Sequence, residues 1–187
     1  LAEAGRLAHA NRTHCVGDPD FVSVPTAALI ASDYLALRSR LIDPIRDIGT
    51  VRPGDPVHCR TDAGVPMGAD TEAAGTSSMS IVDDEGNALA MTMSVGLAFG
   101  SRVFVRGFVL NDELTDFAFR PEVNGIKDVN RPQPGKRPRS SMSPTLVFDG
   151  GGRFHLSVGS VGGNNIVGYV SEALVAMLDG GMDPQRA

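Results

Sequence analysis

The sequence has no tryptophan, and aromatic residues make up only 5% of its 187 positions. A core must therefore be built from Leu, Val, Ile, Met and Ala rather than from large rings. Only two cysteines are present, Cys15 and Cys59, and they belong to no C-x-x-C pair. We interpret both as ordinary thiols rather than as metal ligands or a disulfide framework. The four histidines are equally scattered, so the pattern does not indicate a zinc site.

An excess of positive charge is also missing, because the formal net charge is −5 at pH 7. The one basic cluster, residues 131–139, is interleaved with Pro and Gly. We interpret it as a structured, solvated loop rather than as a nucleic-acid site. No apolar run approaches the length that a transmembrane helix needs. The composition therefore indicates a folded protein with no nucleic-acid partner and no membrane span in this chain.

Residues 1–75 are predicted to be helical at first and irregular later. Leu and Ala recur among polar residues over 2–11, which is typical of an amphipathic helix. The pattern predicts a second helix over 26–42, with Arg38 facing away from its apolar side. From 51 to 75 there is no periodicity, and Gly, Pro, Asp and Thr dominate. A loop of this length is typical of a functional or disordered segment rather than of a simple connector.

The second part of the chain, residues 76–187, is predicted to contain strands and one long helix. Strands are expected at 79–82, 88–97, 108–110, 144–148 and 154–158, with a turn at 84–87 and a hairpin formed by the last two strands. A helix is expected from about 166 to 178. The apolar character of the first two strands predicts a sheet covered on both faces. The combination of helices and strands predicts an α+β fold.

The boundary between Gly75 and Thr76 is a place where chemistry can be proposed. A threonine hydroxyl is a weak nucleophile unless a base lies beside it, and an N-terminal threonine supplies that base with its own α-amine. Self-cleavage requires the hydroxyl to attack the preceding carbonyl, and Gly75 has no Cβ to obstruct that approach. Taken alone, a Gly-Thr pair at this point is equally typical of the start of a strand.

A second candidate is the turn at Gly162-Gly163, between the predicted strand 154–158 and the predicted helix 166–178. Its surroundings fit neither G-x-G-x-x-G nor G-x-x-x-x-G-K-[ST]. Two glycines at a strand-to-helix turn still leave backbone N–H groups that can bind an anion or oxyanion. The alternative is a tight turn that needs glycine for its conformation.

Several stretches in a fixed order carry a resemblance to a known family. They are TSSMSIVDDEGNA at 76–88, FGS at 99–101, LNDELTDF at 110–117, PGKRPRSSMSPT at 134–145 and GSVGG at 159–163, preceded by GDPDFV at 17–22. Together they resemble the gamma-glutamyltranspeptidases. In this resemblance residues 1–75 correspond to the C-terminal segment of the large subunit and 76–187 to most of the small subunit. The implied fold is part of the four-layer αββα sandwich of N-terminal-nucleophile hydrolases.

The resemblance also implies catalytic roles. Thr76 matches the nucleophile that is freed when the Gly75–Thr76 bond is cut, and it would carry the glutamyl group as an ester. Ser94 matches a hydroxyl residue that orients the nucleophile. Gly162 and Gly163 match the pair whose backbone N–H groups form the oxyanion hole.

Four further residues match the family's substrate-binding positions. Asp116 and Glu113 correspond to groups that bind the substrate α-ammonium, and Ser140 and Ser141 to hydroxyls that hold its α-carboxylate. Acidic groups for an amine and hydroxyl donors for a carboxylate are chemically appropriate. The implied substrates are glutathione-like gamma-glutamyl amides, with water, an amino acid or a peptide as acceptor. The resemblance implies no metal and no organic cofactor.

The sequence departs from the family pattern at three positions. Ser77 and Ser78 stand where the family has Thr and His, and Gly96 replaces a frequent Asn that helps to bind the substrate amine. An acylase or amide hydrolase with a different acyl specificity is therefore the first alternative. A non-catalytic, unprocessed binding domain is the second.

The family's large subunit extends well before the position of Leu1 and includes an Arg that pairs with the α-carboxylate. We therefore expect this polypeptide to be a fragment that needs the remaining large-subunit segment and is inactive by itself. Members of the family are commonly exported, so the expected location is the periplasm or the cell exterior.

Overall fold

The structure, a computed structural model, describes residues 1–56 and 75–187. Cys59 and most of the loop predicted for 51–75 lie outside these residues. The described chain divides into two compact units. The first contains residues 1–56 and 114–139, and the second contains residues 75–113 and 140–187. We describe each unit by itself.

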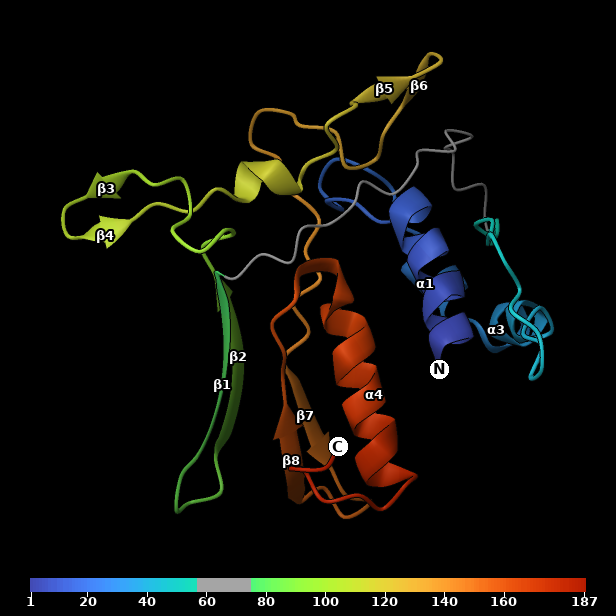
Figure 1. The fold of residues 1–187 in the computed structure, drawn as a ribbon, viewed down its shortest axis with the longest axis vertical. Coiled ribbons are helices and arrows are strands. Elements are labelled where there is room, and N and C mark those ends of the chain that lie inside the picture. The colour runs from blue at the N-terminus through green and yellow to red at the C-terminus, as the bar shows by residue number, and fades with distance from the viewer. Residues whose placement is uncertain (57–74) are drawn as a thin grey trace. The chain divides into compact units, whose positions relative to one another are not determined.

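The regular elements of the first unit are mainly helices (Figure 1). Its elements are α1 (Ala2–Cys15), α2 (Thr26–Leu29), α3 (Ser32–Ser39) and a short hairpin of β5 (Glu122–Val123) and β6 (Ile126–Lys127). The helix predicted over 2–11 is confirmed and extends to Cys15. The β5–β6 hairpin lies in a region for which the sequence predicted no strand.

The single helix predicted for 26–42 is wrong, because the structure has two helices there. The break falls at Ala31, whose backbone is extended with φ −62° and ψ 134°. The side chain of Asp33 accepts the N–H of Tyr34 at 2.8 Å. Such a local bond in the first turn satisfies a donor that has no partner within the helix and favours a new helix start.

The basic cluster at 131–139 is bonded within the first unit and is not simply solvated. Arg137 forms an ion pair with Asp18, with 2.7 Å between Nη2 and Oδ1, and the Asp18 side chain is only 1% exposed. Lys136 is buried, and its Nζ donates to the Val129 carbonyl at 2.6 Å. Arg139 donates to the carbonyl of Thr13 at 3.1 Å, near the C-terminal end of α1. A cation at this end of a helix is favourable because the last carbonyls are unsatisfied.

The second unit contains three hairpins and one long helix. Its elements are β1 (Thr76–Val82), β2 (Ala88–Ser94), β3 (Phe104–Val105), β4 (Phe108–Val109), β7 (Thr145–Phe148), β8 (Phe154–Val158), η2 (Gly163–Asn165) and α4 (Ile166–Leu178). The 3-10 turn η1 (Glu113–Asp116) falls where the two units divide. The predicted hairpin at 144–158 and the helix at 166–178 are confirmed, whereas β3 was not predicted.

The β1–β2 hairpin has a regular antiparallel register that pairs Thr76 with Ser94 and Val82 with Ala88. Asp83 organises the turn, because its Oδ1 accepts the backbone N–H groups of Glu85 and Asn87 at 3.0 and 2.7 Å. Carboxylates commonly stabilise turns in this way. The turn therefore fixes which residues face each other at the open end of the hairpin.

The β1–β2 hairpin also contacts the β7–β8 hairpin within this unit, through small side chains. The hydroxyls of Ser80 and Ser157 lie 2.7 Å apart. Gly159 follows β8, and a Cβ there would lie 2.0 Å from the Ser78 hydroxyl. On the β8 side, α4 buries Ile166 and Val170. Figure 1 shows α4 alongside the β7–β8 hairpin.

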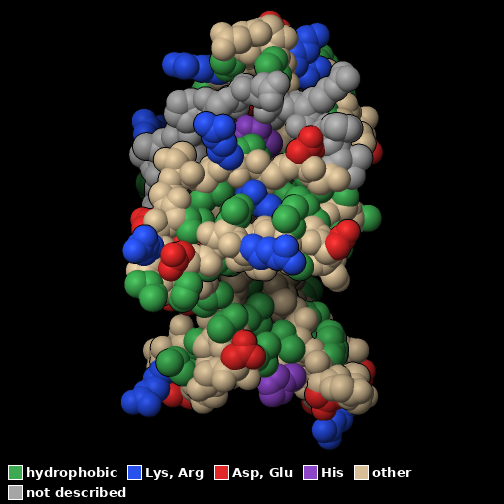
Figure 2. Space-filling model, turned by 90° about the vertical axis from the view of Figure 1, so that its right-hand side faces the viewer, with side chains coloured by type: hydrophobic (Ala, Val, Ile, Leu, Met, Phe, Trp, Pro, Cys, Tyr) green, Lys and Arg blue, Asp and Glu red, His purple; other side chains and the backbone are tan. Residues whose placement is uncertain are grey.

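Within the described chain, apolar side chains of β1 and β2 are exposed. This contradicts the prediction of a sheet that is covered on both faces. Ile81 is 55% exposed, and Leu89 and Met91 are also exposed. Figure 2 shows hydrophobic side chains at many points of one face of the molecule. Within residues 1–56 and 75–187 the buried apolar side chains are few: Leu7, Cys15, Phe117, Ile166 and Val170. None of the described helices is both long enough and apolar enough to cross a membrane.

The ion pair of Asp18 predicts a measurable pH dependence of stability. Hydrogen bonds from the Arg137 side chain and backbone hold the pKa of Asp18 well below its usual range. A carboxyl whose pKa is lowered by folding stabilises the folded state above its ordinary pKa, and this contribution is lost as the pH falls. We expect the melting temperature of the parent to fall more steeply than that of Asp18→Asn between about pH 7 and about pH 3.

Thermal unfolding of the full-length gene product across this range measures the difference. Arg137→Met should reduce the steepness in the same way, because the carboxylate loses its cationic partner. Parallel curves for the parent and Asp18→Asn would contradict the assignment.

Candidate active site

The side chains of Thr76 and Ser94 meet at the open end of the β1–β2 hairpin. Thr76 is the first residue of β1 and Ser94 the last residue of β2, and they lie directly opposite each other. Their hydroxyl oxygens are 2.9 Å apart, within hydrogen-bonding distance. Opposed residues of an antiparallel pair bring their Cβ atoms within about 5 Å, so two short hydroxyl side chains can meet there. The structure therefore places Ser94 where it can orient the Thr76 hydroxyl.

The peptide before Thr76 is closely packed. A Cβ on Gly75 would lie 2.3 Å from the carbonyl oxygens of both Gly96 and Leu97. The Gly75 carbonyl also accepts the N–H of Val95 at 3.0 Å. This peptide is therefore held in place by backbone contacts, and only glycine fits at position 75 without a shift.

The Gly162-Gly163 turn lies just before α4. Gly162 has φ 125° and Gly163 has φ 54°, and a Cβ on Gly162 would lie 2.6 Å from the ring of Tyr169. Within residues 1–56 and 75–187, neither glycine N–H donates to a protein acceptor. The positive φ values fit the tight turn that needs glycine for its conformation. The predicted binding of an oxyanion by these N–H groups stays a prediction.

Ser141 is brought next to this turn. Its hydroxyl donates to Oδ1 of Asn164 at 3.2 Å, and Asn164 directly follows Gly163. Ser140 uses its hydroxyl to accept the N–H of Met142 at 3.2 Å. The two serines and the glycine turn belong to the same unit as Thr76.

The two acidic residues predicted to bind an ammonium group are placed differently. Glu113 is in the unit of Thr76, and its Oε1 is buried with no hydrogen-bond partner among the described residues. A buried carboxylate oxygen without a hydrogen bond is energetically costly, so a donor is expected to bind there. Asp116 belongs to the other unit, where its carbonyl accepts Nδ2 of Asn130 at 2.7 Å. Its predicted role beside Thr76 stays a prediction.

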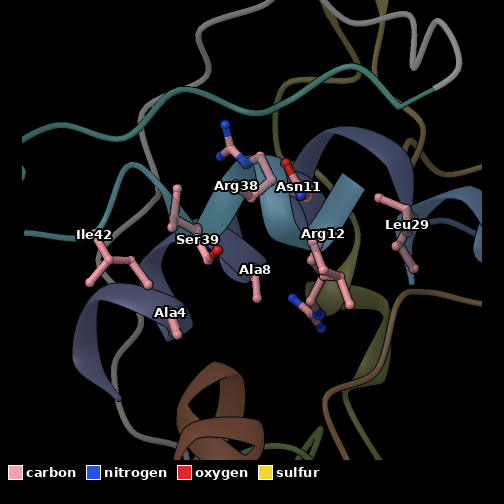
Figure 3. A pocket seen from close by; sticks show the side chains of 11 residues that line it. Ala4, Ala8, Asn11, Arg12, Leu29, Arg38, Ser39 and Ile42 are labelled. Carbon is pink, nitrogen blue, oxygen red and sulfur yellow. The ribbon is translucent and has the colours of Figure 1, made fainter. Parts of the chain in front are cut away.

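The first unit contains an apolar pocket of about 270 Å³ beside α1 (Figure 3). Ala4, Ala8, Leu29 and Ile42 contribute to its lining, together with Arg38. Arg38 was predicted to face away from the apolar side of its helix, which is wrong. None of the residues predicted for catalysis or substrate binding lines this pocket. Among the described residues, no group of three His, Cys, Asp or Glu side chains is arranged to hold a metal ion.

Three residues of the site were not predicted from the sequence. Asn164 bonds Ser141, Gly159 allows the close approach to Ser78, and Asp112 bonds the turn that follows Ser94. Gly159 and Asp112 lie within the stretches 159–163 and 110–117 that carry the family resemblance. The sequence pattern therefore marked the segments, although not the contacts that these residues make.

Comparison with known proteins supports the family resemblance found in the sequence. The model of the family described as gamma-glutamyltranspeptidase matches residues 1–187. A glutathione hydrolase proenzyme from a Pseudomonas species is 36% identical over 99% of this chain, which covers 31% of that protein. The glutathione hydrolase proenzyme of Escherichia coli is 35% identical over 100% of this chain, which covers 32% of that protein. The chain thus spans about a third of the length of these curated relatives.

Solved structures agree. A gamma-glutamyltranspeptidase from Pseudomonas nitroreducens, complexed with L-DON, has a TM-score of 0.53 and 38% identity, with 58% of this chain and 60% of that chain covered. A variant of the Helicobacter pylori gamma-glutamyltranspeptidase has a TM-score of 0.51 and 34% identity, with 57% of this chain and 61% of that chain covered. These neighbours have the N-terminal-nucleophile hydrolase fold, which confirms the predicted fold class. The chain belongs to the gamma-glutamyltranspeptidase family.

Proposed function

We propose that the protein containing this chain transfers or hydrolyses gamma-glutamyl groups through a glutamyl ester on Thr76. The amine of Thr76 is freed by self-cleavage of the Gly75–Thr76 bond. The observation that carries the proposal is the 2.9 Å contact between the hydroxyls of Thr76 and Ser94, directly after a glycine with no room for a side chain. The curated relatives named glutathione hydrolase proenzyme support both the activity and the processing.

The proposed cleavage uses the same hydroxyl as the later reaction. Thr76 Oγ1 attacks the carbonyl carbon of Gly75, the peptide becomes an ester, and water hydrolyses this ester to leave a carboxylate on Gly75 and a free amine on Thr76. In the mature site this amine takes the hydroxyl proton as Oγ1 attacks the gamma-amide of the substrate. The proton then passes to the leaving amine, and water or an acceptor amine takes the glutamyl group from the ester.

The turn at Gly162 and Gly163 is proposed to stabilise the oxyanion of each tetrahedral intermediate. Its N–H groups donate to no protein acceptor among the described residues. Preorganised donors of this kind act without reorganisation during the reaction, and losing one typically costs about 3 kcal/mol of the barrier.

Substrate recognition is proposed to divide between acidic and hydroxyl groups. The buried Oε1 of Glu113 has no hydrogen-bond partner among the described residues, which suits the α-ammonium of a glutamyl group. Asp116 is the second proposed carboxylate. Ser140 and Ser141 are proposed to bind the α-carboxylate. The proposed donors are glutathione-like amides, and the acceptor is water, an amino acid or a peptide.

A further segment of the large subunit is the proposed partner of this chain. The apolar side chains of β1 and β2 are exposed, including Ile81, Leu89 and Met91. The chain also spans only about a third of its relatives' length. Covering these strands would complete the sandwich that the family resemblance implies.

The proposed location is the periplasm or the cell exterior. The interpretation of Cys15 as an ordinary thiol is wrong, because Cys15 is not free in the structure. The proposed location is supported by the resemblance to a family whose members are commonly exported.

Self-processing is the first test of the proposal. We expect the full-length gene product to yield a fragment that begins Thr-Ser-Ser-Met, measured by intact mass and N-terminal sequencing. Thr76→Ala removes the attacking hydroxyl, so this variant should remain a single chain. An uncut parent at neutral pH over days would overturn the proposal and favour the non-catalytic binding domain.

Acyl specificity separates the proposed activity from the related acylase. The processed parent should release p-nitroaniline from gamma-glutamyl-p-nitroanilide faster than it cleaves a glutaryl amide, which lacks the α-ammonium that Glu113 would bind. Faster cleavage of the glutaryl amide would instead support the acylase.

The packing at Gly75 predicts a second effect on processing. Gly75→Ala places a Cβ against the carbonyls of Gly96 and Leu97. The displaced peptide should therefore be cut at about one tenth of the parent's rate or more slowly. Gly168→Ala is the matched control, because no atom lies within 4 Å of its added Cβ and it lies in α4. The fraction of cut chain over time, followed by mass spectrometry, measures both. Equal rates for the two variants would contradict the predicted constraint.

A further inference from the structure

The Ser94 hydroxyl is held from two sides. On one side lies Oγ1 of Thr76 at 2.9 Å, and on the other the backbone N–H of Gly96 donates to Ser94 Oγ at 2.9 Å. A hydroxyl that already accepts one hydrogen bond is polarised toward donating its own proton. The position of Gly96 therefore influences how Ser94 bonds the proposed nucleophile.

Gly96 lies in the turn just after β2, beyond the residues that pair with β1. Its φ is +85°, in the left-handed region that favours glycine. Asp112 holds this turn at two points. The Asp112 N–H donates to the Val95 carbonyl at 3.1 Å, and its Oδ1 accepts the Leu97 N–H at 3.0 Å.

The Asp112 carboxylate also fills the space beside Gly96. A Cβ on residue 96 would lie 1.6 Å from Asp112 Oδ1. The lack of a side chain on Gly96 is therefore what allows the carboxylate to reach the Leu97 N–H. Gly96 and Asp112 form one interlocked arrangement.

We infer that Asp112 is a positioning residue for the nucleophile. Its carboxylate fixes the turn at 95–97, the turn aims the Gly96 N–H at Ser94, and Ser94 orients the Thr76 hydroxyl. Asp112 touches neither Thr76 nor Ser94 in any bond described above, and it acts through the backbone. This inference rests on the proposed function of Thr76.

Two substitutions separate the carboxylate's bond from its charge. Asp112→Ala removes the acceptor of the Leu97 N–H, whereas Asp112→Asn retains a side-chain oxygen that can accept it. We expect Asp112→Ala to lower both the rate of self-cleavage and kcat about tenfold, with KM for a gamma-glutamyl donor little changed. Asp112→Asn should restore both rates to within about threefold of the parent.

The matched control is Asp149→Ala, in the turn of the β7–β8 hairpin of the same unit. Asp149 also accepts backbone N–H groups in a turn, so its loss should reduce stability in a similar way while leaving kcat within about twofold. Equal losses of kcat in Asp149→Ala and Asp112→Ala would overturn the inference, since stability alone would then explain both. A rise in KM with unchanged kcat in Asp112→Ala would also overturn it, because Asp112 would then act on the substrate.

Hydrogen exchange tests the inference without relying on turnover. Mass spectrometry of the peptide spanning 94–99 should show faster exchange in Asp112→Ala than in Asp149→Ala or the parent. Unchanged exchange would overturn the positioning role even where the parent is fully processed. A parent that stays uncut would instead overturn the proposed function, and with it the catalytic consequence of the turn.

Discussion

The antiparallel register of β1 and β2 is the constraint on which the candidate site depends. It sets Thr76 opposite Ser94 with their hydroxyls 2.9 Å apart. A slip of one residue would turn every side chain of a strand to the other face of the hairpin. The Asp83 turn fixes one end of this register, and the Asp112 contacts hold the chain just beyond the other end. Thr76 is therefore placed by turn chemistry at both ends of a seven-residue ladder.

Glycines make the remaining close approaches possible. Gly75 lies against backbone carbonyls, and Gly159 brings the end of β8 to the Ser78 hydroxyl, two residues after Thr76. The same segment continues into the Gly162-Gly163 turn, whose N–H groups donate to no acceptor in the described chain. The proposed nucleophile and the proposed oxyanion site are thus tied together inside one compact unit. Larger side chains at these points would separate the elements that the chemistry needs together.

Local patterns predicted the regular elements well and the tertiary contacts poorly. The hairpin at 144–158 and α4 follow from alternation, turn residues and a long apolar helical run, so sequence alone predicted them. The helix at 26–42 was wrong because the backbone is extended at Ala31, and the apolar periodicity continues across this break. The basic cluster was judged solvated because the partner of Arg137 lies 119 positions away, at Asp18. Residue chemistry alone left Thr76 equally explained as the start of a strand, and Ser94 was named only through the family resemblance.

The division into two units bears on what cleavage at Gly75–Thr76 would do. The first unit joins residues 1–56 to residues 114–139, which come from opposite sides of that bond. Asp18 and Arg137, and likewise α1 and Arg139, are bonded to each other from opposite sides of that bond. The predicted subunit boundary at 75/76 therefore does not coincide with a boundary in packing. Among the described residues, the buried Asp18 carboxylate is bonded by Arg137 and by the N–H of Asp20 in its own turn. Separating the two segments would remove its cationic partner, which opposes dissociation. Cleavage would thus free the Thr76 amine while non-covalent bonds keep the two new chains together.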